Sequence, residues 1–458
     1  MVACAPASMT GAVRGRRVTN MPMAGAFAAQ PAKASKKAWI VLAVLCLVYV
    51  LNFLDRQLLS ILAKPIQDSL HVTDGQLGLI GGLYFALFYC LIAIPVGWLA
   101  DKTNRVGVLA AACALWSAAT MACGLSANYP QLVAARMTVG VGEAGGVPPS
   151  YAIISDYFPP ARRGVALSLY NLGPPIGQAV GVAVGASIAA AFGWRQAFIT
   201  LGAAGLVAAI MVRLIVREPR RGGFDLPPAI PAPGTSLPKT GFVATVKMFF
   251  SSPTLVLAAF ASGATQIVTY GAGNFSTLFL MREKGMTLQE VALYSSAVVA
   301  ICMGGGILVS GRVIDRFSHR SKQTFATIPA ATLAAAVPFF LAFVWAPTWP
   351  VALAFLAAPT FLNYFYLSAA VTLVQNEVRP DQRVLSGALL LLVMNLIGLG
   401  LGPTFVGAMS DFFRPTHPHN SLQLAFLCLT PFYALAILLF LALARVLRRR
   451  AAQPGATA

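Results

Sequence analysis

Apolar stretches about as long as a bilayer is thick recur along nearly the whole of this 458-residue sequence. A helix needs about 20 mostly apolar residues to cross the hydrocarbon core. Hydrophobic residues make up 58% of the chain and charged residues 10%, far from the roughly 25% charge of a soluble domain. The breaks between the stretches are short, so no soluble catalytic domain fits between them. We therefore expect an all-α integral membrane protein.

Twelve of these stretches are predicted to span the membrane. They cover residues 38–65, 75–100, 106–127, 130–158, 163–191 and 194–217, then 253–282, 288–314, 323–345, 349–377, 382–411 and 420–447. The segment 218–252 is the one long interior loop, and its prolines prevent a continuous helix. We expect it to be a cytoplasmic linker between two six-helix bundles, residues 38–217 and 253–447. Residues 1–37 and 448–458 are expected to be cytoplasmic tails, the first of them disordered.

The distribution of basic residues predicts the orientation. Of the 33 Lys and Arg residues, 26 fall in the tails and in the loops on their side, five in the opposite loops, and two inside spans. Because Lys and Arg accumulate in cytoplasmic loops, both termini are expected in the cytoplasm. This topology and the compact loops suit a prokaryote, so we expect the protein in the inner membrane of a bacterium. The net charge of +19 then reflects topology, and nucleic acid is not an expected partner.

An internal repeat supports two related halves. GWLADKTNR at Gly97–Arg105 is answered by GRVIDRFSHR at Gly311–Arg320, and Pro160–Arg163 by Pro380–Arg383. The offsets are 214 and 220 residues, so two separate landmarks share nearly one period. Such repeats are typical of transporters built from duplicated units.

The first copy of that loop has the pattern G-x-L-x-D-x-x-x-R, which is similar to the signature loop of the major facilitator superfamily. Gly97 permits close helix approach, Asp101 accepts hydrogen bonds, and Arg105 can pair with carboxylates across the two halves. We expect these residues, with Asp315 in the second copy, to form a conformational latch. An ordinary basic loop is the alternative.

Four charged residues fall inside predicted spans: Asp55, Arg56, Arg136 and Glu143. Each costs about 2.5 to 3.5 kcal/mol at mid-membrane, so they must pair or face water. From the rise of a helix, Asp55 lies roughly 14 Å and Arg136 roughly 10 Å below the same surface. Arg136 and Glu143 are seven residues apart and share a helix face.

Two interpretations of these four residues stay open. One is a proton-responsive switch, because a carboxyl in a low-dielectric cavity changes its protonation with its surroundings, and such residues often mark pathways. The other is a structural salt bridge between the first and fourth spans. In the second half, the polar candidates for a cavity wall, or for plain interhelical hydrogen bonding, are Gln266, Tyr270, Asn274, Asn363, Tyr364 and Tyr366.

Several segments of the first half resemble the spinster family: NFLDRQLLSIL at 52–62, IQDSL at 66–70, GWLADKTNR at 97–105 and RMTVGVGEA at 136–144. The resemblance implies the major facilitator fold and transport of lysolipids or sphingosine-phosphate-like lipids. It also implies that Asp55, Arg56 and Glu143 couple protonation to alternating access. Arg136 is expected to take part in this coupling, and Arg56 and Glu143 to face the substrate.

The expected function is proton-linked secondary transport of an amphiphilic lipid by a monomer. The alternatives are a proton symporter for a small organic anion such as a sugar acid, and a membrane sensor that transports nothing. We expect neither an enzyme nor a metal or other cofactor. No catalytic triad, metal-ligand or phosphate-binding spacing occurs, the four histidines fall in loops, and the seven cysteines form no CxxC pair.

The topology can be tested with reporter fusions. A reporter active only in the cytoplasm, fused after residue 450, should be active, because the charge distribution places this end inside. A fusion in the loop at residue 193, predicted to lie outside, is the control. An inactive fusion after residue 450 together with an active fusion at residue 193 would contradict the topology.

Overall fold

The computed structural model describes residues 35–221, 241–318, 321–379 and 382–451. Parts of both predicted tails and of the linker lie outside the described residues, namely residues 1–34, 222–240 and 452–458. The same holds for Arg320, Pro380 and Asp381 of the repeats and for the side chain of Asp101. The described residues contain helices and no strand, which confirms the predicted all-α class.

The helices follow the twelve predicted spans closely, although several spans are divided. The first half contains α1 (Lys36–Ile61), α2 (Ala63–Leu70), α3 (Asp74–Gly81), α4 (Leu83–Lys102), α5 (Arg105–Gly124), α6 (Tyr129–Glu143), α7 (Val147–Tyr157), α8 (Pro160–Tyr170), α9 (Gly173–Phe192) and α10 (Trp194–Ile215). Eleven helical segments of the described chain are long and apolar enough to cross a membrane. The remaining predicted span is the one divided between α6 and α7.

The second half begins at the predicted place, because α12 (Pro253–Arg282) follows Ser252 directly. It continues with α13 (Leu288–Glu290), η1 (Val291–Ser295), α14 (Ser296–Val298), η2 (Val299–Met303), α15 (Gly304–Ser318), α16 (Thr324–Trp345), α17 (Trp349–Leu362), α18 (Phe365–Glu377), α19 (Arg383–Phe413), α20 (Ser421–Leu427) and α21 (Thr430–Ala451). The sequence did not predict α11 (Phe242–Ser251), which lies in the linker after its prolines.

Local signals fix several helix starts. Thr73 and Gln76 form a reciprocal capping box at the start of α3, and Asn104 and Asn128 accept backbone hydrogen bonds at the starts of α5 and α6. Gly193 has a φ of +87°, which only glycine adopts without strain, and it turns the chain sharply between α9 and α10.

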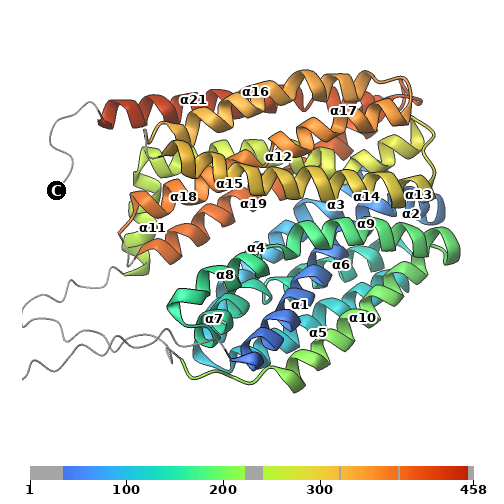
Figure 1. The fold of residues 1–458 in the computed structure, drawn as a ribbon. Helices are drawn as coiled ribbons and strands as arrows, with labels where there is room; N and C mark the ends of the chain where they lie inside the picture. Colours follow the sequence, from blue (N-terminus) through green and yellow to red (C-terminus); the bar gives the residue numbers. More distant parts are fainter. Residues whose placement is uncertain (1–34, 222–240, 319–320, 380–381, 452–458) are drawn as a thin grey trace, which may run out of the picture. The chain divides into compact units, whose positions relative to one another are not determined.

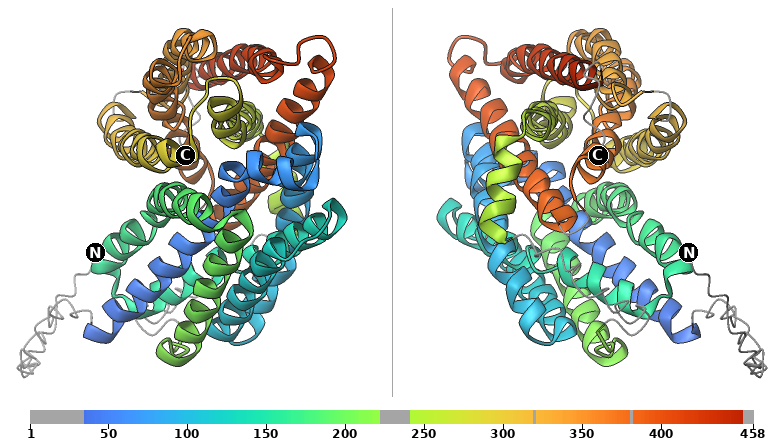
Figure 2. Two further views of the ribbon diagram at one scale, coloured as in Figure 1. Left: turned by 90° about the vertical axis from the view of Figure 1, so that its right-hand side faces the viewer. Right: turned by 90° about the vertical axis from the view of Figure 1, so that its left-hand side faces the viewer.

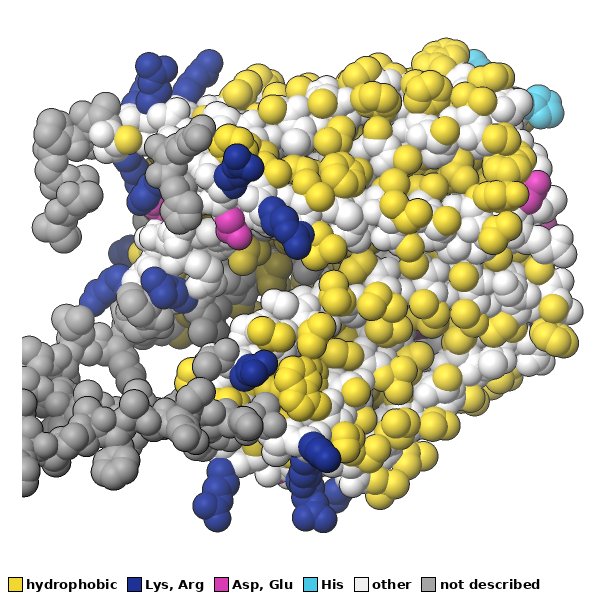
Figure 3. All heavy atoms as spheres, viewed as in Figure 1, with side chains coloured by type: hydrophobic (Ala, Val, Ile, Leu, Met, Phe, Trp, Pro, Cys, Tyr) yellow, Lys and Arg dark blue, Asp and Glu magenta, His cyan; other side chains and the backbone are white. Residues whose placement is uncertain are grey.

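The helices of the two halves lie in two groups, seen from the side in Figure 1 and from both ends in Figure 2. We call the end where α1 starts and α21 finishes the proximal end, and the other the distal end. Figure 3 shows apolar side chains along the flank, and Lys and Arg gathered at the proximal end, where the surface is hollowed between the halves. An apolar flank between polar ends suits a protein embedded in lipid.

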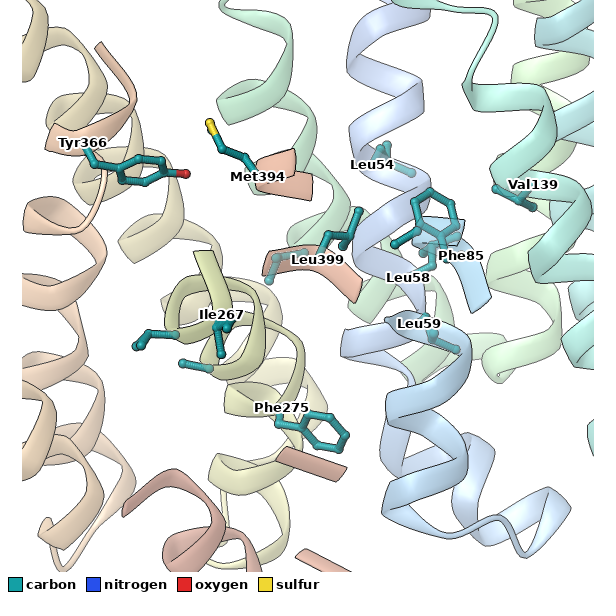
Figure 4. Packing of buried hydrophobic residues seen from close by; sticks show 14 of the residues in the cluster. Leu54, Leu58, Leu59, Phe85, Val139, Ile267, Phe275, Tyr366, Met394 and Leu399 are labelled. Carbon is teal, nitrogen blue, oxygen red and sulfur yellow. The ribbon is translucent and has the colours of Figure 1, made fainter. Parts of the chain in front are cut away.

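The halves contact one another through apolar side chains near the middle of the bundle. Leu58 and Leu59 lie on α1, Ile267 and Phe275 lie on the neighbouring α12, and Leu399 of α19 is seen between the two helices in Figure 4. All five side chains are buried. This contact separates the hollow at the proximal end from the distal end.

At the distal end a polar cluster joins the halves; we call Asp74, Arg282, Ser410 and Asp411 the distal clasp. Asp74 is fully buried and accepts two hydrogen bonds from Arg282, at 2.9 and 2.8 Å, and one from Ser410 at 2.5 Å. Asp411 accepts the backbone N–H groups of Asp74 and Gly75 at 3.1 and 2.8 Å. A carboxylate at the start of α3 is favoured by the helix dipole. Among the described residues, the hydrogen bonds between halves lie at this end and near mid-bundle, so the bundle is closed distally.

Removal of the clasp arginine should open the distal end. Arg282→Ala leaves Asp74 buried without its charge partner, which costs about 3 to 5 kcal/mol in the closed state only. Spin labels at the exposed positions 71 and 417 should then report a longer distance between the halves. Arg195→Ala is the matched control, because Arg195 bonds Ser69 and Ser126 within one half. Equal distances in Arg282→Ala and wild type would contradict the role of the clasp.

Candidate functional site

Two ion pairs join α1 to α6 inside the first half. Arg56 Nε lies 2.6 Å from Glu143 Oε2, and Arg136 Nη1 lies 3.3 Å from Asp55 Oδ2. Thr120 of α5 donates a further hydrogen bond to Asp55 at 2.9 Å. The structure thus brings together all four charged residues that the sequence placed inside spans. Each carboxylate therefore has its own arginine partner.

The two pairs differ in their surroundings. The side chains of Asp55 and Arg136 are 6% and 3% exposed, whereas that of Arg56 is 13% exposed and that of Glu143 fully buried. The Arg56 guanidinium lies 4.8 Å from the ring centres of both Phe53 and Tyr89, which favours the cation. Glu143 Oε1 has no hydrogen-bond partner among the described residues. Arg136 Nε likewise has no partner among these residues, so each pair keeps one unsatisfied atom, and the arginines of both pairs reach a cavity.

A cavity of about 70 Å³ lies between the halves at the level of the two ion pairs. Arg56 and Arg136 line it from the first half, and Tyr270, Asn274 and Tyr364 from the second. Ser60 Oγ, also on its wall, donates to the carbonyl oxygen of Asn274 at 2.7 Å. This cavity is therefore polar and cationic on one side and uncharged on the other.

A second cavity of about 110 Å³ extends into the second half. Most of its lining is apolar, including Val182, Leu280, Val298, Val299, Met303, Leu353 and Leu356. The two cavities share wall residues, namely Gln57, Gln178, Thr269, Gly273 and Tyr364. They therefore adjoin, with a charged chamber leading to an apolar one.

Not every predicted cavity residue lines these chambers. Asn363 lines the larger cavity and also bonds Tyr433 at 2.9 Å. Gln266 instead packs against Gly398 of α19, and Tyr366 is buried and points toward Met394 in Figure 4. These two side chains lie away from the chambers because they belong to the packing between helices of the second half.

Arg56, Tyr270 and Asn274 line the smaller chamber, while Glu143 lies behind Arg56 and is not on the wall. Gln57 and Gln178 were not predicted from the sequence, yet their side chains hydrogen-bond at 2.8 Å at the junction of the chambers. Each is an amide inside an apolar span, and that property was the signal that could have found them.

The predicted latch is not engaged across the halves. Arg105 pairs with Asp156 of α7 at 2.5 Å, so its partner lies in the same half. A Cβ added to Gly97 would meet no described atom within 4 Å, and the close helix approach expected there is absent. Asp315 is exposed. All three observations follow from the separation of the halves at the proximal end.

Residues 45–398 match the Major Facilitator Superfamily, which is well over half of the chain. The chain belongs to this family. It is a multi-pass membrane transporter and not an enzyme. The twelve-span, two-bundle prediction agrees with the family's fold.

The relatives of the chain include an efflux pump and spinster proteins. It is 31% identical over 388 residues to an MFS-type efflux pump from Mycolicibacterium smegmatis, covering 82% of this chain and 85% of the pump. It is 26% identical to human protein spinster homolog 1, covering 84% of this chain and 75% of that protein. The crystal structure of a bacterial homolog of the human lysosomal transporter spinster, inward-facing and unoccupied, has a TM-score of 0.84 at 28% identity. That match covers 92% of this chain and all of the other.

The Arg56–Glu143 pair predicts a stability pattern. Arg56→Ala should lower the unfolding temperature in detergent, because it leaves a buried carboxylate without its partner, at a cost of about 3 to 5 kcal/mol if the carboxylate stays charged. Adding Glu143→Gln should recover most of this loss, since the double variant buries no unpaired charge. Lys64→Ala, which breaks an exposed pair with Asp68, should change little. Additive losses in the double variant would show that the two residues act separately.

Proposed function

We propose that this transporter moves an amphiphilic lipid, such as a lysophospholipid or a sphingosine-phosphate-like molecule, in a proton-linked cycle of alternating access. The observation that carries the proposal is the junction of two unlike chambers. A charged chamber with two arginines adjoins a mostly apolar one in the second half. An amphiphile has the same division between head and tail.

The head group belongs in the smaller chamber. Arg56 and Arg136 offer guanidinium groups that bind phosphate or carboxylate through charge-assisted hydrogen bonds. Tyr270 and Asn274 complete the wall with uncharged polar groups. An anionic or zwitterionic head group is therefore favoured over a neutral one.

The acyl chain belongs in the larger chamber. Each methylene that leaves water for an apolar site contributes about 0.8 kcal/mol. A sugar acid would instead bury hydroxyl groups against aliphatic walls, and each unpaired hydroxyl costs about 1 to 3 kcal/mol. The lining residues therefore favour a lipid over a small polar solute.

The arrangement of Arg56 supports a link to protons. Glu143 neutralises Arg56 in the structure, so a bound anion competes with this carboxylate. Protonation of Glu143 weakens the ion pair and frees Arg56 for the head group. Asp55 is held by Thr120 and by Arg136, which lines the same cavity, and it would complete the coupling through that arginine. Proton and anionic head group would then be favoured together.

The orientation follows from charge. Basic side chains gather at the hollowed proximal end (Figure 3), which we propose faces the cytoplasm of a bacterial cell, with both termini inside. In this state the substrate path opens inward, and the latch at Gly97, Asp101, Arg105 and Asp315 would engage when the path opens outward. One chain supplies both halves, so we propose a functional monomer.

A second candidate is a proton symporter of a small organic anion. The size of the charged chamber, about 70 Å³, and its two arginines favour this alternative. It gives no role to the apolar chamber, and we therefore rank it second. A membrane sensor without transport gives no role to either chamber.

Transport into liposomes tests the proposal. Purified protein should transport labelled lysophospholipids with apparent affinity rising with acyl length until the larger chamber is filled, and faster with a pH gradient than without. Asp55→Asn with Glu143→Gln should abolish the response to the gradient. Lys64→Ala is the control. Flat affinity across acyl lengths together with tight binding of a short sugar acid would favour the anion symporter, and a gradient response that survives in the double variant would place the coupling elsewhere.

A further inference from the structure

The wall of the larger chamber contains an irregular helix. Residues 288–318 form one continuous span, yet Val291–Ser295 and Val299–Met303 are π-helical turns. Both turns reach the chamber, through Ser295, Val299 and Met303. Neither turn contains glycine or proline. Because π-helical turns are rare and occur frequently at functional sites, the two turns indicate that this wall has a functional role besides helix packing.

The first π-helical turn presents a hydroxyl to the chamber. The side chain of Ser295 is buried, and its oxygen has no hydrogen-bond partner in the described part of the chain. The neighbouring Ser296 behaves as helix serines usually do, donating to the carbonyl oxygens of Ala292 at 2.6 Å and Leu293 at 3.0 Å. The two serines therefore differ in two respects, since only Ser295 lines the chamber and only its hydroxyl has no partner.

Two other polar groups on this wall, those of Thr360 and Asn363, are already used by the protein. Thr360 donates to the carbonyl oxygen of Leu356 at 2.8 Å, and Asn363 bonds Tyr433. Ser295 instead lies among Val298, Val299 and Met303 on the lining. A charged group would be poorly accommodated beside these aliphatic side chains. An uncharged hydroxyl or carbonyl group of a ligand fits both the free hydroxyl and its apolar surroundings.

We infer that Ser295 is a specificity-determining residue that recognises an uncharged hydrogen-bonding group, a hydroxyl or carbonyl, carried on the chain of the amphiphilic substrate. The inference rests on the proposed function, because it assigns the larger chamber to the substrate's chain. It narrows the substrate class from amphiphiles in general to those with an oxygen function part-way along the chain.

Competition binding to the full-length protein in liposomes tests this. The probes are lysophospholipids of one acyl length, either unsubstituted or carrying a single hydroxyl at successive chain positions. In wild type, one narrow range of positions should bind about 5- to 10-fold more tightly than the others, the effect of one hydrogen bond. Ser295→Ala should abolish this preference, while binding of the unsubstituted lipid stays within about twofold.

Ser296→Ala is the matched control and should keep the positional preference, because its hydroxyl serves the helix backbone. Ser295→Ala should be at least as thermally stable as wild type, since it removes an unpaired buried hydroxyl, so a folding defect will not obscure the result. Equal binding at every hydroxyl position in wild type, or a preference that survives Ser295→Ala, overturns the inference while leaving lipid transport intact. Failure of wild type to bind any of the lipids overturns the proposed function as well.

Discussion

Four charged side chains buried between α1 and α6 constrain the rest of this transporter. A charge in the membrane interior is tolerated only when it is paired or hydrated, and here each carboxylate has its own arginine. The pairs hold the two helices in register and keep both arginines at the wall of a cavity. The charged residues of the chambers thus belong to the first half, and the second half supplies the uncharged wall.

This division of roles explains why the two halves, although related by an internal repeat, differ inside. The first half has little freedom around its ion pairs, because loss of one partner leaves a buried charge. The second half carries no such charges at the chambers and instead contains two π-helical turns and a mostly apolar cavity. Changes in its lining alter packing and single hydrogen bonds, which cost less than unpaired charges do. The second half is therefore the part where selectivity can vary without loss of the fold.

The sequence predicted what depends on composition and local pattern. Span positions follow from apolar length, and α12 begins at Pro253 as expected because Ser252 ends the linker. The grouping of Asp55, Arg56, Arg136 and Glu143 followed from helix rise and the cost of unpaired charge.

The cavity wall was predicted only in part, since a four-residue spacing does not tell which neighbour a side chain meets. Gln266 meets Gly398, whereas Tyr270 and Asn274 reach the chamber. The π-helical turns were not predicted, because VALYS and VAICM carry no local signal for them. The latch partner of Arg105 depends on conformation, which a sequence pattern does not specify.

The position of α1 connects these features to alternating access. Within little more than one turn, Arg56 pairs with Glu143, Gln57 bonds Gln178 of α9, and Ser60 donates to α12 across the halves. Arg56 and Ser60 are four residues apart and share a helix face. In the proposed cycle, a head group that draws Arg56 away from Glu143 would therefore act on the same turn that carries a contact between the halves. The distal clasp lies farther from the chamber and joins the halves at the distal end of the bundle. A ligand can shift the balance between the inward-open and outward-open states only by binding one of them more tightly. This turn of α1 can transmit such a difference in binding, because it carries both a chamber residue, Arg56, and a contact between the halves, made by Ser60.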